Sequence, residues 1–61
     1  MELNRRYIIR VLLNGQLLTY TGKIIFEDLE FVSFIDKFGS KVSVNKKTIQ
    51  SYEEVRHEYS K

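Results

Sequence analysis

The side chains best suited to binding chemistry are two adjacent lysines and a phenylalanine beside a turn. Lys46 and Lys47 follow Asn45, and together they present two cations and an amide that suit a phosphate or a base edge. Phe31 follows an acidic turn, and an aromatic ring at such a place can stack on an unpaired base. These residue types predict nucleic-acid contacts. The plainer alternatives are a solvated turn for the lysines and a core position for Phe31.

Three arginines near the start of the chain are candidate phosphate contacts. Arg5, Arg6 and Arg10 flank or interrupt the first apolar run, where they serve solubility equally well. The chain of 61 residues carries 10 basic and 8 acidic side chains, a formal net charge of +2. This excess of two positive charges is too small to predict nucleic-acid binding by itself. Any basic surface must therefore come from how the charges are distributed.

Groups that could support catalysis or bind a metal are few. Asp28 and Glu30 lie close in sequence, but acid–base catalysis needs a shielded pocket that separates two pKa values, and this stretch is expected to be a solvated turn. The chain has no cysteine and a single histidine, His57, in a polar tail. Neither a metal cluster nor a nucleophile beside a histidine base is predicted. We therefore expect a protein that is not an enzyme and that uses no cofactor or metal.

Short strands are expected to position these residues. Asn14-Gly15 between two apolar runs predicts a type I′ hairpin, and no proline interrupts the chain. In the second strand, Leu18, Tyr20, Gly22, Ile24 and Phe26 are expected to share one face, with Gly22 marking a bend or a close backbone approach. The β-branched and aromatic content predicts strands over residues 7–13, 16–27, 30–37, 41–45 and 48–55.

This pattern predicts an all-β fold, a small and strongly bent five-stranded antiparallel barrel of the SH3-like or Sm-like type. Residues 1–52 form the single domain and residues 53–61 a polar tail, in which 53–59 are a candidate helical turn. Apolar residues fall on both faces of the strands, so a lone sheet would leave many of them wet. Cover must come from the tail, from barrel closure or from a second copy of the chain. We favour the second copy, because a long apolar edge strand is prone to aggregate.

Residues 11–51 resemble the Sm-like family, and its bacterial Hfq branch most closely. Asn14-Gly15, Gly22 and Asp28 fall on the family's first motif, together with the apolar positions Val11, Leu13 and Ile24. In the second motif, here "VSVNKKTIQS", Lys46 and Ile49 match the lysine and isoleucine. Asn45 and Lys47 stand where that motif has tyrosine and histidine. Only "MELNRR" precedes the first strand, which leaves no room for the family's N-terminal helix.

The resemblance implies an RNA-binding protein of post-transcriptional regulation. A cytoplasmic location is expected on other grounds: the chain has no cysteine, and Arg10 interrupts the apolar stretch that a signal peptide would need. Strand four of one subunit would pair with strand five of the next, closing a homo-oligomeric ring of about six or seven that binds single-stranded, uridine-rich RNA. Phe31 would stack a base, Lys46 and Lys47 would hold a phosphate or base edge, and Asn45 and Asp28 would hydrogen-bond nearby. The alternative is a small SH3-like regulator of the phage or plasmid type that binds a host protein; a double-stranded DNA-binding barrel is a third. No membrane partner is expected, because no apolar run is long enough to span a bilayer.

Overall fold

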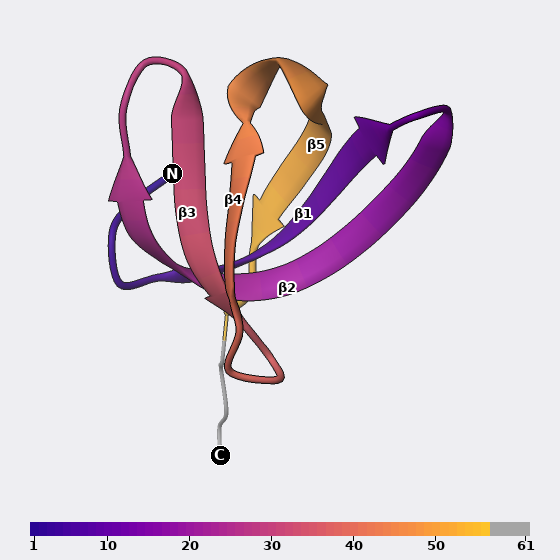
Figure 1. Cartoon of the computed structure of the whole chain (residues 1–61). Helices are drawn as coiled ribbons and strands as arrows, with labels where there is room; N and C mark the ends of the chain where they lie inside the picture. The colour runs from indigo at the N-terminus through magenta and orange to yellow at the C-terminus, as the bar shows by residue number, and fades with distance from the viewer. Residues whose placement is uncertain (57–61) are drawn as a thin grey trace.

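The computed structural model describes residues 1–56, which form one five-stranded antiparallel sheet in the order β4-β3-β2-β1-β5 (Figure 1). The predicted all-β class is confirmed. Residues 57–61, which include His57 and the end of the candidate helical turn, lie outside the described part. The elements are β1 (Arg6–Leu13), β2 (Gln16–Glu27), β3 (Phe31–Asp36), β4 (Lys41–Asn45), the 3-10 helix η1 (Lys46–Thr48) and β5 (Ile49–Glu54).

The turn between β1 and β2 has the conformation that its sequence predicts. Asn14 and Gly15 have φ angles of 50° and 78°, so both central residues adopt the positive φ that a type I′ turn requires. The turn places Leu13 opposite Gln16 and carries that register without a slip to Arg6 opposite Lys23. The resulting hairpin is long, and its tip projects from the rest of the molecule (Figure 1).

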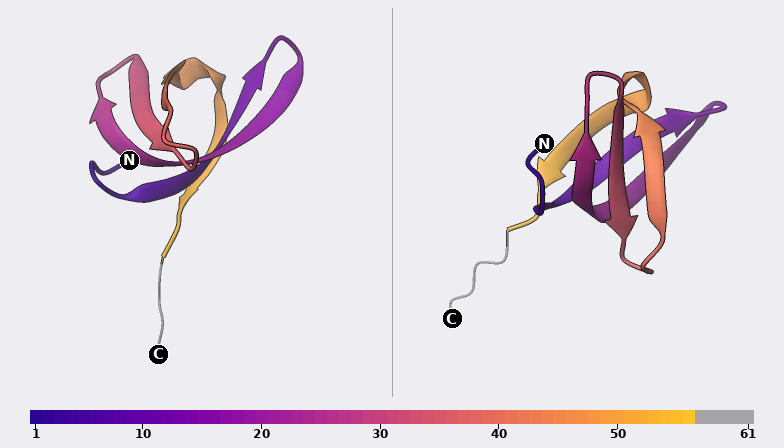
Figure 2. Two further views of the ribbon diagram at one scale, coloured as in Figure 1. Left: turned by 60° about the horizontal axis from the view of Figure 1, so that its bottom comes forward. Right: turned by 60° about the vertical axis from the view of Figure 1, so that its left-hand side comes forward.

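The sheet curls strongly, and its inner face carries the core (Figure 2). Gly22 permits a close approach there, as its place in the strand predicts. A Cβ atom on Gly22 would lie 2.4 Å from Cδ1 of the buried Phe34 and 3.0 Å from the carbonyl oxygen of Ile35. The core consists of Tyr7, Ile9, Val11, Ile24, Val32, Phe34 and Val44.

The curled sheet does not close into a barrel. Among residues 1–56, β4 pairs only with β3 and β5 pairs only with β1, although η1 joins β4 directly to β5. The predicted five antiparallel strands and the strong bending of the sheet are confirmed, but among residues 1–56 the sheet stays open where a closed barrel was predicted. The fifth strand continues through Glu53 and Glu54, as predicted for residues 48–55, and the Val55 N–H donates to the Arg6 carbonyl oxygen at 2.9 Å. Residues 53 and 54 are therefore strand and not the start of the candidate helical turn.

The prediction that Phe26 shares a face with Ile24 is wrong, because Ile24 is buried and Phe26 is 50% exposed. The pairing of β2 with β3 shifts register between Ile24 and Phe26, which leaves Ile25 as an extra residue. Such a bulge reverses which side chains point inward. Phe26 is consequently exposed, and Glu27, the next residue, is half-buried instead.

Several large apolar side chains remain exposed on the single chain, as the apolar character of both faces predicts. The projecting hairpin contributes Leu12, Leu13 and Leu17, and the far end of β2 contributes Ile25 and Phe26. Within residues 1–56, no helix has the length and apolar character needed to cross a membrane.

Candidate nucleic-acid interface

The loop between β2 and β3 and the junction between β4 and η1 meet at one end of the sheet (Figure 1). Phe31 lies directly opposite Asn45 in the β3–β4 ladder, and the Lys46 N–H donates to the Glu30 carbonyl oxygen at 2.7 Å. This end therefore unites five predicted contacts that are up to 19 positions apart in sequence, and we call them the loop-end site: Asp28, Phe31, Asn45, Lys46 and Lys47.

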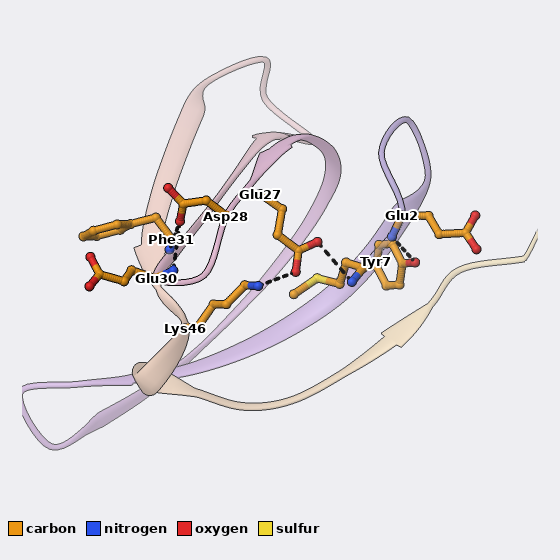
Figure 3. Close-up of polar contacts among 8 residues, drawn as sticks. Glu2, Tyr7, Glu27, Asp28, Glu30, Phe31 and Lys46 are labelled. Carbon is orange, nitrogen blue, oxygen red and sulfur yellow. Dashed lines mark hydrogen bonds and ion pairs between the residues drawn. The ribbon is translucent and has the colours of Figure 1, made fainter.

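Asp28 holds the backbone of the loop in place. Its Oδ1 accepts hydrogen bonds from the Phe31 N–H at 2.7 Å and the Glu30 N–H at 2.9 Å, and its own N–H donates to the Phe31 carbonyl oxygen at 2.9 Å (Figure 3). The bond from the Phe31 N–H, followed by that from Glu30, lowers the pKa of Asp28, so the carboxylate stays ionised at neutral pH. These bonds hold the backbone of Phe31, the first residue of β3, in place.

The Phe31 side chain lies at the surface, so it is not a core residue. Its exposed fraction is 42%, and its ring points away from the Lys46 ammonium (Figure 3). An exposed ring held on a rigid strand beside polar groups can stack on a base at little entropic cost.

Lys46 is paired with a carboxylate that the sequence does not single out. Its Nζ lies 2.6 Å from Oε2 of Glu27, whose Oε1 lies 3.2 Å from the amino group of Met1 (Figure 3). The hydrogen bond from Lys46 lowers the pKa of Glu27, with a smaller contribution from the amino group, and this outweighs the effect of burial. The Lys46 ammonium therefore already has a carboxylate partner, which it shares with the amino group of Met1.

Asn45 and Lys47 complete the site from the other strand. The Oδ1 of Asn45 accepts from the Lys47 N–H at 2.8 Å, and the Asn45 carbonyl oxygen accepts from Oγ1 of Thr48 at 2.7 Å. These bonds cap η1 and fix the chain direction at the junction. The Lys47 side chain is exposed and takes part in no ion pair among residues 1–56, so it is the cation of the lysine pair that is open to a phosphate.

The three arginines do not join the loop-end site. Arg5 pairs with Glu54 at 2.7 Å and with Glu2 at 3.6 Å, and the bond to Glu54 raises the Arg5 pKa. Arg10 contacts Oγ of Ser51 at 3.4 Å across β1 and β5. Arg6 lies opposite Lys23 at the far end of β1. Counting back from Asn14-Gly15 makes this last pairing predictable from the hairpin register, although Lys23 belongs to no motif that points to binding.

The Glu27–Lys46 contact predicts an acid-dependent stability. Because folding holds the Glu27 pKa below its ordinary value, this carboxylate stabilises the fold above the ordinary glutamate range and loses its contribution as pH falls through the folded pKa. At pH 7, Glu27→Gln should lower the free energy of unfolding by about 1 kcal/mol. Thermal unfolding of both proteins from neutral to acid pH should show this difference shrinking as the pH falls.

The control is Glu30→Gln, which removes an exposed carboxylate from the same loop. Its melting temperature should follow the wild type at every pH. If the stability lost in Glu27→Gln stays constant from neutral pH into strong acid, the shape of the Glu27 side chain, and not its charge, stabilises the fold.

Within residues 1–56, no three histidine, cysteine, aspartate or glutamate side chains gather as a metal site would require. The chemistry available at the loop-end site is therefore aromatic stacking, an amide, an ionised carboxylate and one exposed ammonium.

Comparison with known protein families, with curated proteins and with solved structures finds no match to this chain.

Proposed function

We propose that this protein binds single-stranded RNA at the loop-end site, acting as a homo-oligomer in post-transcriptional regulation. The observation that carries the proposal is the placement of Phe31. The ring is exposed, its backbone is held by Asp28, and it lies directly opposite Asn45, with Lys47 following in the same turn. A stacking ring, an amide and a cation in one small area are the groups that an unpaired nucleotide requires.

The charges of the loop-end site give the bound nucleotide a direction. The ionised carboxylate of Asp28 accepts hydrogen bonds and repels phosphate, so a base N–H group faces Asp28. Lys47 belongs to η1, and its exposed ammonium attracts phosphate. The nucleotide therefore lies across Phe31 with its base toward the β2–β3 loop. Uridine, which offers an N–H donor beside two carbonyl oxygens, suits Asp28 and Asn45 together.

Two open strand edges support assembly of several copies. β4 and β5 each have a neighbour on one side only in the described chain, and from Gln50 to Glu54 every residue of β5 is exposed. An unpaired edge is a ready template for another strand, and β4 of one chain and β5 of the next are antiparallel candidates. A ring of about six or seven chains would present one loop-end site per chain. Avidity then multiplies weak single contacts by roughly 100- to 10,000-fold.

The direct test is binding of fluorescent oligouridine at several salt concentrations. We expect binding at micromolar protein or tighter. The logarithm of the affinity should fall linearly with the logarithm of salt, by about 0.7 for each phosphate neutralised on a single strand. Binding that is absent at micromolar protein, or indifferent to salt, contradicts the proposal.

The second candidate function is binding of a host protein, and the projecting hairpin favours it. Leu12 and Leu17 form an exposed cross-strand pair near the tip, and Leu13 adds an exposed apolar side chain on the other face of the hairpin. Exposed apolar groups gathered on one projection are typical of a protein contact. Pull-down with and without nuclease separates the two functions, because a partner retained after nuclease treatment binds the protein and not its RNA.

A further inference from the structure

A basic trough crosses the sheet at the end opposite the loop-end site. Two adjoining hollows of about 640 and 550 Å³ share Asn4, Arg6 and Lys23 in their walls. One extends to Glu54 and the residues that follow β5, and the other to the turn between β3 and β4. The cations of this trough are Arg5, Arg6, Lys23, Lys37 and Arg56.

The trough holds an excess of positive charge. Only two carboxylates line it, and both already have partners. Oε2 of Glu54 lies 2.7 Å from Nη1 of Arg5, and Oδ1 of Asp36 accepts from the Phe38 and Ser40 N–H groups, each at 2.9 Å. Glu54 neutralises Arg5, which is itself one of these cations, so five cations over two carboxylates leave a formal excess of three positive charges, which attracts anions.

Two of the cations are forced together by the fold. Arg6 and Lys23 are direct cross-strand partners in the β1–β2 ladder, both are exposed, and no ion pair within residues 1–56 includes either one. Like charges directly opposite each other on a sheet destabilise it. The type I′ turn at Asn14-Gly15 fixes the register, so β1 and β2 cannot slip along each other to relieve the repulsion. An anion bridging both side chains would relieve it.

We infer that the basic trough binds the phosphate backbone of the same single-stranded RNA, an inference that rests on the proposed function. Neighbouring strands lie about 4.8 Å apart, so the path from β5 across β1 and β2 to β3 spans about 14 Å. That length suits several phosphates of an extended chain better than one small anion. Ile25 and Ile35 line part of the trough and offer apolar contact to sugars. The loop-end site thus holds a base, and the trough holds backbone.

The test compares charge-removing variants in the oligouridine assay across salt concentrations. The double variant Arg6→Gln/Lys23→Gln should flatten the plot of log affinity against log salt by about 1.4, because each lost phosphate contact removes about 0.7. The control that removes the same number of charges is Arg10→Gln/Lys41→Gln. Both residues lie outside the trough, so the slope of this control should stay at the wild-type value, and so should that of Arg10→Gln alone. The double variant Arg6→Gln/Lys23→Gln should melt no lower than the wild type, because it removes a repulsion.

The outcomes separate the two proposals. RNA binding with an unchanged slope in the double variant overturns the trough and leaves the loop-end site standing. An equal loss in Arg10→Gln/Lys41→Gln also overturns the trough, because net charge then explains the effect. Displacement of RNA by polyglutamate as readily as by unlabelled RNA overturns it in favour of an acidic protein partner. A flattened slope in the double variant, with normal affinity after Phe31→Ala, supports the trough and overturns the loop-end site.

Discussion

Gly22→Ala should lower the free energy of unfolding by about 2 kcal/mol. An alanine in place of a strand glycine ordinarily gains about 0.5–1 kcal/mol from backbone entropy. Here the added Cβ would lie 2.4 Å from Cδ1 of the fully buried Phe34 and 3.0 Å from the Ile35 carbonyl oxygen. Overpacking typically costs 1–3 kcal/mol or more, and the backbone oxygen cannot rotate away, so the clash outweighs the entropic gain.

Thermal unfolding followed by circular dichroism, at one fixed protein concentration, measures this effect. For a domain this small, a loss of 2 kcal/mol corresponds to a fall of roughly 8–16 °C in the melting temperature. The double variant Gly22→Ala/Phe34→Leu should recover part of the loss, because leucine vacates the space that the aromatic ring fills. A single variant as stable as the wild type would show that β2 and β3 do not approach as closely as described.

Phe31→Ala should weaken binding of oligouridine by about 5- to 150-fold. Stacking of a base on an aromatic ring contributes about 1–3 kcal/mol, which corresponds to that range of affinity. Because 42% of Phe31 is exposed and it belongs to no part of the buried core, the substitution should leave the melting temperature nearly unchanged. The salt slope should also stay constant, since no charge is removed.

Phe38→Ala is the matched control for this prediction. Phe38 is 81% exposed and lies in the turn at the opposite end of β3. The Lys37 ammonium lies over its ring, 5.5 Å from the ring centroid. Its substitution removes a more exposed phenylalanine ring from a place far from the loop-end site, so the affinity should change little. Equal weakening by the two substitutions would show general apolar adhesion and would remove Phe31 as the stacking platform.

Local sequence signals predict most of this fold because its turns are specified by few residues. Asn14-Gly15 fixes a type I′ turn, and that turn fixes the register of all eight β1–β2 pairs. Gly22 is recognisable as a close approach because a glycine inside a strand packs nothing of its own. From the same register, the Arg6–Lys23 pair at the trough can be read by counting along the two strands.

Features that depend on tertiary contacts could not be predicted in this way. The bulge at Ile25 interrupts a run of three large apolar residues, which fits either face equally well, so the pattern gives no sign of where Phe26 points. The Glu27–Lys46 ion pair joins residues 19 positions apart, and only the bulge turns Glu27 inward to meet Lys46. Whether Phe31 is core or surface depends in the same way on the curl of the sheet.

The proposed assembly depends on β4 of one chain pairing with β5 of another, and the mass of the particle in solution tests this most directly. Light scattering coupled to gel filtration should give about six or seven times the 7.3 kDa of one chain, with little change on dilution through the micromolar range. A folded particle of 7.3 kDa at every concentration, with or without oligouridine, would contradict the account.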